Sequence, residues 1–284
     1  VAKLNSDVRL EDLIRGVIVQ SGNDASIAIA EGMAGSESAF AGLMTERARK
    51  IGLETSVFKN STGLPDPGQK VTARELARLA VHIITTYPQQ YRYYSEPEFE
   101  WNRIKQRNRN PLLPMGIGAD GMKTGFTEKS GYGIVGSAVR EGQRLVVVLS
   151  GMSSKRQRAE EARKILDWGF RAFDNREIFA AGEIIGEARV YGGAKRNIGL
   201  TAKSGLRLYT PIGNADRVKA NIVYQGPIIP PVAKGDQIGQ LQVYISGQLS
   251  QQTPLYAAED MEKGDFYRRA MDAFEELALG WIRF

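Results

Sequence analysis

The chain has 284 residues, 42% hydrophobic and 25% charged, a balance typical of soluble globular proteins and enough for about two domains. Its net charge of +6 is spread along the sequence without a basic block, so we expect no nucleic-acid partner. The absence of cysteine excludes disulfides and thiolate metal sites, and a single histidine, His82, argues against a histidine metal site or a Ser-His-Asp triad. We expect neither a metal nor a cofactor, and no apolar run of about 18 residues predicts a membrane-spanning helix.

The first hundred residues are predicted to be mainly helical. Apolar positions 10, 13, 14, 17 and 18 repeat at helical spacing, and Asp7 is a candidate N-cap. Turn-forming residues 20–24 end that helix, and an Ala- and Ile-rich helix over 25–34 is expected to be buried. Further helices are predicted over 38–51 and after Thr72, which has Glu75 at the capping-box spacing. The segment 52–68 between them is rich in loop residues, and the aromatic, polar segment 87–101 is predicted to be extended.

A β hairpin and a long helix follow in the sequence. Residues 132–139 and 145–149 are predicted to be strands joined by a turn at 140–143. A helix is predicted over 154–173, with its buried side formed by Ala162, Ile165, Leu166, Trp168, Gly169 and Phe173.

The composition changes from about Asp174 onward. Short β-like runs between Gly and Pro turns predict a small all-β domain, over residues 184–185, 187–191, 206–209, 218–224 and 240–246. We therefore divide the chain into a first domain over 1–173, a β-rich domain over 174–262 and a terminal helix over 263–284.

The end of the chain has a strongly amphipathic pattern, from Phe266 to Phe284. One stripe carries Phe266, Ala270, Phe274, Leu277, Trp281 and Phe284. Such a helix could dock onto the β-rich domain or lie in the plane of a membrane surface. Its terminal position and Trp281 favour the membrane, and both interpretations stay open.

The segment Asp120-Gly121-Met122-Lys123-Thr124-Gly125 comes just before the hairpin. On an extended strand Lys123 and Gly125 project to one face and Thr124 to the other, although twist or a bulge can bring the hydroxyl round. Gly125 leaves room for a backbone or a ligand to approach closely. A cation, a hydroxyl and a bare backbone edge together suit a ligand that ends in a carboxylate.

A second short motif, Ser21-Gly22-Asn23, follows the first predicted helix. Ser-x-Asn and Lys-Thr-Gly are two of the three motifs of penicillin-binding proteins and class A β-lactamases. With the segments 13–16, 20–25, 108–110 and 120–125, the chain closely resembles the low-molecular-weight penicillin-binding proteins that act as D-alanyl-D-alanine carboxypeptidases. The resemblance covers essentially the whole chain. It implies an α/β (α+β) fold: a β-lactamase/transpeptidase-like domain with an antiparallel sheet and helices, then a small all-β domain and an amphipathic C-terminal helix.

The resemblance implies removal of the terminal D-Ala from peptidoglycan stem pentapeptides through an acyl-enzyme, with β-lactams as inhibitors. It implies a periplasmic location at the outer face of the bacterial cytoplasmic membrane. Carboxypeptidase and endopeptidase preference stay open. The implied catalytic residues are Ser21, Asn23 and Lys123, and the implied substrate-binding residues are Thr124, Gly125, Phe126 and Arg109.

Each of these residues has an implied role. Ser21 would relay a proton to the leaving amine, Asn23 would bond the substrate amide, and Lys123 would keep the pocket positive. Thr124 and Arg109 would bind the substrate carboxylate, whereas the backbone N–H of Phe126, beside Gly125, would form half of an oxyanion hole. Taken alone, Ser21-Gly22-Asn23 indicates a turn between helices rather than a site, and Arg109 can be a surface turn residue.

The family's third motif is Ser-x-x-Lys, which carries the acylated serine and lies upstream of Ser-x-Asn. The residues before Ser21 do not contain it. Ser56-Val57-Phe58-Lys59 has the letters, but it follows Ser21, lies in a predicted loop and lacks the helix onset that would place both side chains on one face. We therefore expect the nucleophile on an N-terminal fragment outside this chain. The alternatives are a β-lactamase, for which no convincing Glu-x-x-x-Asn loop is found, and a non-catalytic cell-wall scaffold.

Overall fold

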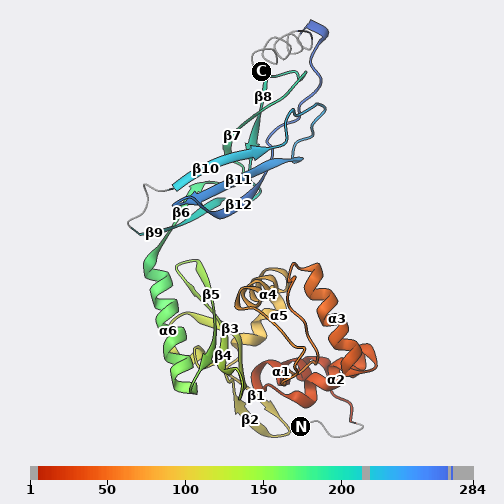
Figure 1. Ribbon diagram of the computed structural model, residues 1–284, viewed down its shortest axis with the longest axis vertical. Helices are drawn as coiled ribbons and strands as arrows, with labels where there is room; N and C mark the ends of the chain where they lie inside the picture. The colour runs from red at the N-terminus through yellow and green to blue at the C-terminus, as the bar shows by residue number, and fades with distance from the viewer. Residues whose placement is uncertain (1–5, 213–217, 268–269, 271–284) are drawn as a thin grey trace. The chain divides into compact units, whose positions relative to one another are not determined.

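The computed structural model describes residues 6–212, 218–267 and 270. The chain divides into two compact units, Val1–Arg171 and Ala172–Phe284. Figure 1 labels their elements. The first unit combines helices with an antiparallel sheet and the second is built of strands, which confirms the predicted fold class.

Four helices begin the first unit: α1 (Leu10–Gln20), α2 (Asn23–Ala34), α3 (Glu37–Lys50) and α4 (Ala73–Thr86). All four were predicted, but the N-cap of α1 is Arg9 rather than Asp7. Helix α2 is less buried than expected, with only Ala25 and Ala30 buried, because it packs mainly against α1 and α3. Thr72 caps α4 as predicted, its hydroxyl accepting a hydrogen bond of 3.1 Å from the amide of Glu75.

The expectation of an extended segment over 87–101 was wrong for most of its length. Pro88 begins a helical turn, α5 (Pro88–Tyr91), and a 3₁₀ turn, η1 (Arg92–Ser95), follows at once. These turns bury the rings of Tyr91 and Tyr93. A short hairpin, β1 (Glu98–Trp101) and β2 (Ile104–Arg107), comes next, and a 3₁₀ turn, η2 (Leu113–Met115), leads to the sheet.

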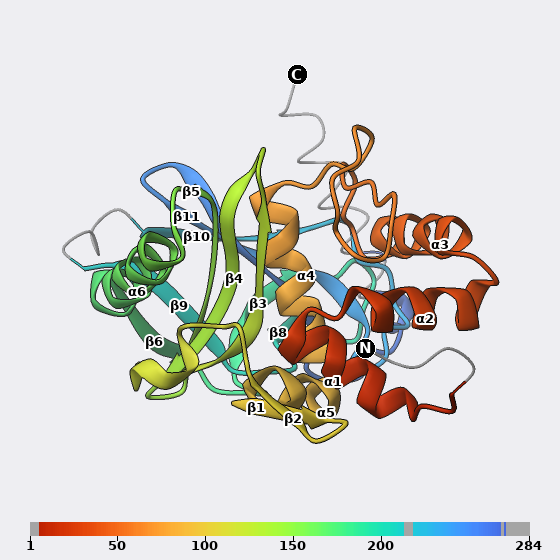
Figure 2. The same cartoon turned by 90° about the horizontal axis from the view of Figure 1, so that it is seen from below.

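The centre of the first unit is a three-stranded antiparallel sheet in the order β3-β4-β5. Its strands are β3 (Ala119–Thr127), β4 (Gly131–Arg140) and β5 (Gln143–Met152). Figure 2 shows α6 on one side of the sheet and α4 on the other. Leu112, Ile134 and Leu166 belong to the core on the α6 side, and Ala80, Tyr91 and Met122 to the core on the α4 side.

Helix α6 (Lys155–Ala172) was predicted, and its buried side agrees with the expected one at Ala162, Leu166 and Gly169 but not at the other predicted positions. The buried residues are Arg158, Ala159, Ala162, Leu166 and Gly169. Ile165 and Trp168 are instead 39% and 57% exposed, and Phe173 belongs to the next strand. Gly169 allows this side of α6 to approach the sheet closely, because a Cβ there would lie 2.7 Å from Leu145 Cδ1 of β5.

The described part of the second unit consists of strands, as predicted. A five-stranded antiparallel sheet has the order β10-β11-β12-β8-β7, and β6 pairs with β9. The strands are β6 (Phe173–Phe179), β7 (Ile184–Arg189), β8 (Asn197–Thr201), β9 (Leu206–Pro211), β10 (Val218–Tyr224), β11 (Gln237–Ile245) and β12 (Gln248–Ala257).

Three of these strands, β6, β8 and β12, were not predicted. Strand β12 reads as polar, yet its inward-facing Leu255 and Ala257 join a core that includes Ile198, Leu200 and Val243. The predicted C-terminal helix lies almost wholly outside the described residues. Within the described residues, no helix has the length and apolar character needed to cross a bilayer.

Candidate active site

The turn between α1 and α2 places Ser21 at the edge of the sheet. Ser21 adopts a left-handed conformation with φ of 54° and ends α1. Its amide donates to Val17 O at 3.1 Å and that of Gly22 to Gly16 O at 3.0 Å, which closes the helix end. Asn23 starts α2 and its side chain is exposed. The turn is therefore only two residues long, shorter than the predicted five.

Strand β3 brings Lys123 to this turn. The Lys123 ammonium donates one hydrogen bond to Ser21 Oγ and another, of 3.0 Å, to Thr124 O. Because the first uses a lone pair of the Ser21 hydroxyl, the hydroxyl proton is left to be donated elsewhere. The structure thus joins two of the predicted site residues in a pair that can pass a proton outward.

A buried polar group supports β3 from behind. Tyr91 donates to Asp120 at 2.9 Å, and Arg144 forms an ion pair with the same carboxylate at 2.8 Å. Gly121 permits this contact, because a Cβ there would lie 2.5 Å from the Tyr91 hydroxyl. Gly125, by contrast, has no protein atom within 4 Å of a built Cβ, so the space beside it is open.

The electrostatic setting of Lys123 is strongly positive. Burial lowers its pKa to about 8, and the charges of Arg109 and Arg158 act in the same direction. Lys123 is therefore still largely protonated at neutral pH. Arg109 is held near by its backbone, whose N–H donates to Val19 O on α1 at 3.3 Å.

Arg158 is a site residue that the sequence analysis missed. It lies on the buried side of α6, only 6% exposed, and its Nε has no hydrogen-bond partner among the described residues. Burial lowers its pKa, and its guanidinium lies 5.8 Å from the ring of Tyr132. Tyr132 in turn stacks on Phe126, with ring centroids 4.3 Å apart. The sequence does contain a signal for this residue: Arg158 is spaced at four-residue intervals from Ala162 and Leu166, so it falls on the apolar face of the predicted helix.

The rim of the site is an open hollow of about 380 Å³ at the turn between β3 and β4. Phe126, Lys129, Tyr132 and Met152 are among its lining residues. Phe126 is 55% exposed, so its ring presents an apolar surface to solvent immediately after Gly125.

Two other sequence features lie apart from this chemistry. The hydroxyl of Ser56 is buried and donates to the carboxylate of Glu75, so the Ser56-x-x-Lys59 string supports a loop rather than presenting a nucleophile. His82 lies on α4 and contacts the Thr86 hydroxyl at 3.2 Å through Nδ1. Over the described ranges, no group of three His, Asp or Glu side chains is arranged to hold a metal ion.

Comparison with known proteins gives consistent matches in both units. The sequence model described as D-alanyl-D-alanine carboxypeptidase matches residues 1–154, and that of the penicillin-binding protein 5 C-terminal domain matches residues 173–263. The chain is 38% identical to the D-alanyl-D-alanine carboxypeptidase DacC of Escherichia coli K12, over 95% of the chain and 68% of that protein.

Two solved structures extend the comparison. Penicillin-binding protein 5 from Haemophilus influenzae superimposes with a TM-score of 0.80 at 38% identity, covering 92% of this chain and 77% of that one. Penicillin-binding protein D2 from Listeria monocytogenes, in its ampicillin-bound form, gives 0.54 at 26% identity, covering 60% and 75%.

Proposed function

The chain belongs to the serine-type D-alanyl-D-alanine carboxypeptidase family, and on this premise we propose that Ser21, Asn23 and Lys123 act in its acyl transfer. We further propose that Thr124, Gly125, Phe126 and Arg109 bind the substrate. To these we add Arg158.

The observation that carries this proposal is a cluster of uncompensated cations. The charges of the exposed Arg109 and the buried Arg158 both act on Lys123, and within the described part of the chain no carboxylate pairs with any of the three. A buried cation without a counter-ion is costly unless an anion from outside completes the site. The C-terminal carboxylate of a peptide, received by the Thr124 hydroxyl and these cations, supplies that charge.

The proton path follows from the Lys123–Ser21 pair. Attack of a serine oxygen on the carbonyl of the penultimate D-Ala breaks the C–N bond, and the terminal D-Ala must leave as an amine. The proton of the attacking serine passes through the lysine of its own segment to Ser21, as Ser21 gives its hydroxyl proton to that nitrogen, while Lys123 holds the Ser21 oxygen from the other side. Water then cleaves the acyl ester. The backbone N–H of Phe126 stabilises the oxyanion, and the exposed Asn23 bonds the substrate amide.

The attacking serine is proposed to come from a Ser-x-x-Lys segment outside these 284 residues. Ser56 supports this proposal, because its hydroxyl already donates a hydrogen bond to Glu75. Ser56 and Lys59 also lie on a loop rather than on a helix, so they do not share a helix face. A partner segment of this kind would complete the site beside Ser21 and Lys123.

The substrate and the fold suggest where the protein acts. Peptidoglycan stem peptides are found outside the cytoplasmic membrane, so we place the protein in the periplasm. The apolar stripe that includes Phe266 and Trp281 supports peripheral attachment to the membrane surface.

A labelled penicillin tests the proposed function. The chain is fused to, or co-expressed with, its Ser-x-x-Lys segment, and the covalent label is followed by mass spectrometry. We expect a stable label on the serine of that segment and undiminished labelling of the Ser56→Ala variant. No label on either piece would leave a non-catalytic scaffold, and rapid release of the label would indicate a β-lactamase.

A further inference from the structure

We propose that the ion pair between Arg15 and Glu96 is a positioning device, which holds Arg109 and Ser21 in register for substrate binding. The inference rests on the proposed function for the roles of those two residues. Neither Arg15 nor Glu96 is placed in contact with the substrate.

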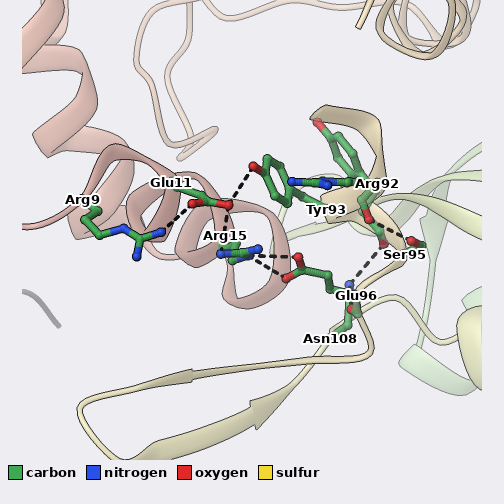
Figure 3. A network of polar contacts seen from close by, with 9 residues as sticks. Arg9, Glu11, Arg15, Arg92, Tyr93, Ser95, Glu96 and Asn108 are labelled. Carbon is green, nitrogen blue, oxygen red and sulfur yellow. Dashed lines mark hydrogen bonds and ion pairs between the residues drawn. The ribbon is translucent and has the colours of Figure 1, made fainter. Parts of the chain in front are cut away.

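The pair connects two segments that supply the site. Arg15 lies on α1, six residues before Ser21, and Glu96 lies between η1 and β1. Figure 3 shows the guanidinium of Arg15 facing the carboxylate of Glu96, with Nε 2.9 Å from one oxygen and 3.1 Å from the other. The side chains are only 24% and 27% exposed, so water screens the attraction less than at an open surface.

Arg15 is fixed on its other sides as well. Its Nη1 is 3.2 Å from Glu11, one turn earlier on α1, and its guanidinium lies 4.9 Å from the ring of Tyr93. The Tyr93 hydroxyl donates a hydrogen bond to Glu11 at 3.0 Å. The guanidinium of Arg92 lies 5.3 Å from the centre of the same Tyr93 ring. Arg15 therefore has one defined orientation, toward Glu96.

Glu96 continues the connection to Arg109. Its backbone oxygen accepts from Asn108 Nδ2 at 2.9 Å. Asn108 Oδ1 then accepts the amide of Asn110 at 2.9 Å, so the side chain of Asn108 braces the backbone on both sides of Arg109. The ion pair thus fixes the support from which Arg109 extends.

The two segments also pack through a buried apolar cluster that contains Ile18, Val19 and Tyr93, whereas their hydrogen bonds nearest the site are longer. Arg109 N–H donates to Val19 O at 3.3 Å, and Gln20 Nε2 donates to Arg107 O at 3.2 Å. Both distances are long for hydrogen bonds of their type. The charge-assisted Arg15–Glu96 contact is the stronger connection, although it lies farther from the site. Its loss is expected to let the Arg109 segment move away from α1.

The first test measures geometry without requiring activity. In Arg15→Ala, the Arg109 amide is expected to exchange with solvent about tenfold faster, because its bond to Val19 opens more often, while amides in β4 stay protected. Arg9→Ala is the matched control, because Arg9 contacts the same Glu11 but is 70% exposed and makes no contact with Glu96. Unchanged exchange at Arg109 in Arg15→Ala would overturn the proposal.

The titration of Lys123, followed by NMR, separates positioning from a direct field effect. If Arg109 moves away, the Lys123 pKa rises from about 8 in both Arg15→Ala and Glu96→Gln. A direct effect of the altered charges would move the pKa in opposite directions, because one variant loses a cation and the other an anion. Opposite shifts would contradict the proposal.

Activity gives a third, separable result. With the Ser-x-x-Lys segment supplied, Arg15→Ala is expected to raise KM about fivefold with little change in kcat, and to add nothing in an Arg109→Ala background. Additive effects, or a lower Tm with unchanged KM, would mean that the pair serves stability alone. Absence of labelling in the wild-type protein would instead refute the proposed function and leave the exchange and titration results to decide on the ion pair.

Discussion

Lys123 donates a hydrogen bond to Ser21 across 102 positions of sequence, and this contact joins the sheet to the helical part of the first unit. The donor is a partly buried ammonium, and the charges of Arg109 and Arg158 act on it. Ser21 is therefore polarised on one side and free to give up its own proton on the other.

The first prediction concerns pH. Because burial, Arg109 and Arg158 lower the Lys123 pKa to about 8, the acylation rate constant should be level up to that pH. Above it, the constant should fall by about tenfold per pH unit as Lys123 loses its proton. In Arg158→Gln a nearby cation is lost, so the Lys123 pKa should rise and the fall of the acylation rate constant should begin at a higher pH. If the rate constant of this variant falls at the same pH as that of the wild type, the fall does not report the titration of Lys123.

Arg158 should show opposite effects on binding and stability. Replacing it with Met removes a buried, uncompensated charge and should raise the Tm of the free protein by about 3 °C. The same change should raise KM for a D-Ala-D-Ala peptide by about 10- to 100-fold, because the substrate carboxylate loses a charged donor. Calorimetry and steady-state kinetics measure the two effects. Lower stability together with unchanged KM would show that Arg158 is only a packing residue.

A pair of glycine substitutions separates folding from ligand access. Gly121→Ala places a Cβ 2.5 Å from the Tyr91 hydroxyl and should lower the Tm by about 5 °C. Gly125→Ala meets no protein atom within 4 Å, so the Tm should be unchanged. Acylation by penicillin should nevertheless fall about tenfold in Gly125→Ala, because the ligand needs that space. Normal acylation in this variant would remove Gly125 from the site.

Glu75 should contribute stability that depends on pH in a defined direction. The Ser56 hydroxyl and the Thr55 amide lower its pKa to about 2, against opposition from burial. Its ionised form therefore stabilises the fold above the ordinary carboxyl range, and this contribution is lost as pH falls from about 4.5 toward 2. Glu75→Gln should lower the Tm by about 5 °C at pH 7, a difference that narrows through this acid range. If the Tm difference between Glu75→Gln and the wild type did not change with pH, the charge of Glu75 would not contribute to stability.

The membrane proposal concerns the residues from Phe266 onward. Deleting 266–284 should abolish sedimentation of the protein with anionic liposomes, because the apolar stripe provides the buried area. Trp281→Ser alone should weaken it. Penicillin labelling should be unaffected in both variants, and unchanged sedimentation of the deletion variant would refute the attachment.

The sequence by itself determined the family, the helices α1–α4 and α6, and the hairpin of the first unit. Local signals are sufficient where one segment carries its own pattern, as in the stripe of α1, the Thr72 cap and the hairpin after Gly125. Two chemical motifs in order, Ser21-Gly22-Asn23 and Lys123-Thr124-Gly125, then identified the family together with the segments around them, because the combination is specific. The same local reasoning missed β12, because its sequence is polar and its strand conformation depends on pairing with β11.

Only the tertiary structure decided which side chains meet. Helix α6 packs closely on the sheet at Gly169 and Leu145, and in that packing Arg158 is buried and Trp168 is exposed. The lowered pKa of Lys123 likewise depends on burial and on charges from segments far apart in the chain. The contacts that connect Arg15, Glu96 and Arg109 join α1 to a segment some 80 residues later. Periodicity reports on one element at a time, whereas these properties arise from the packing of several.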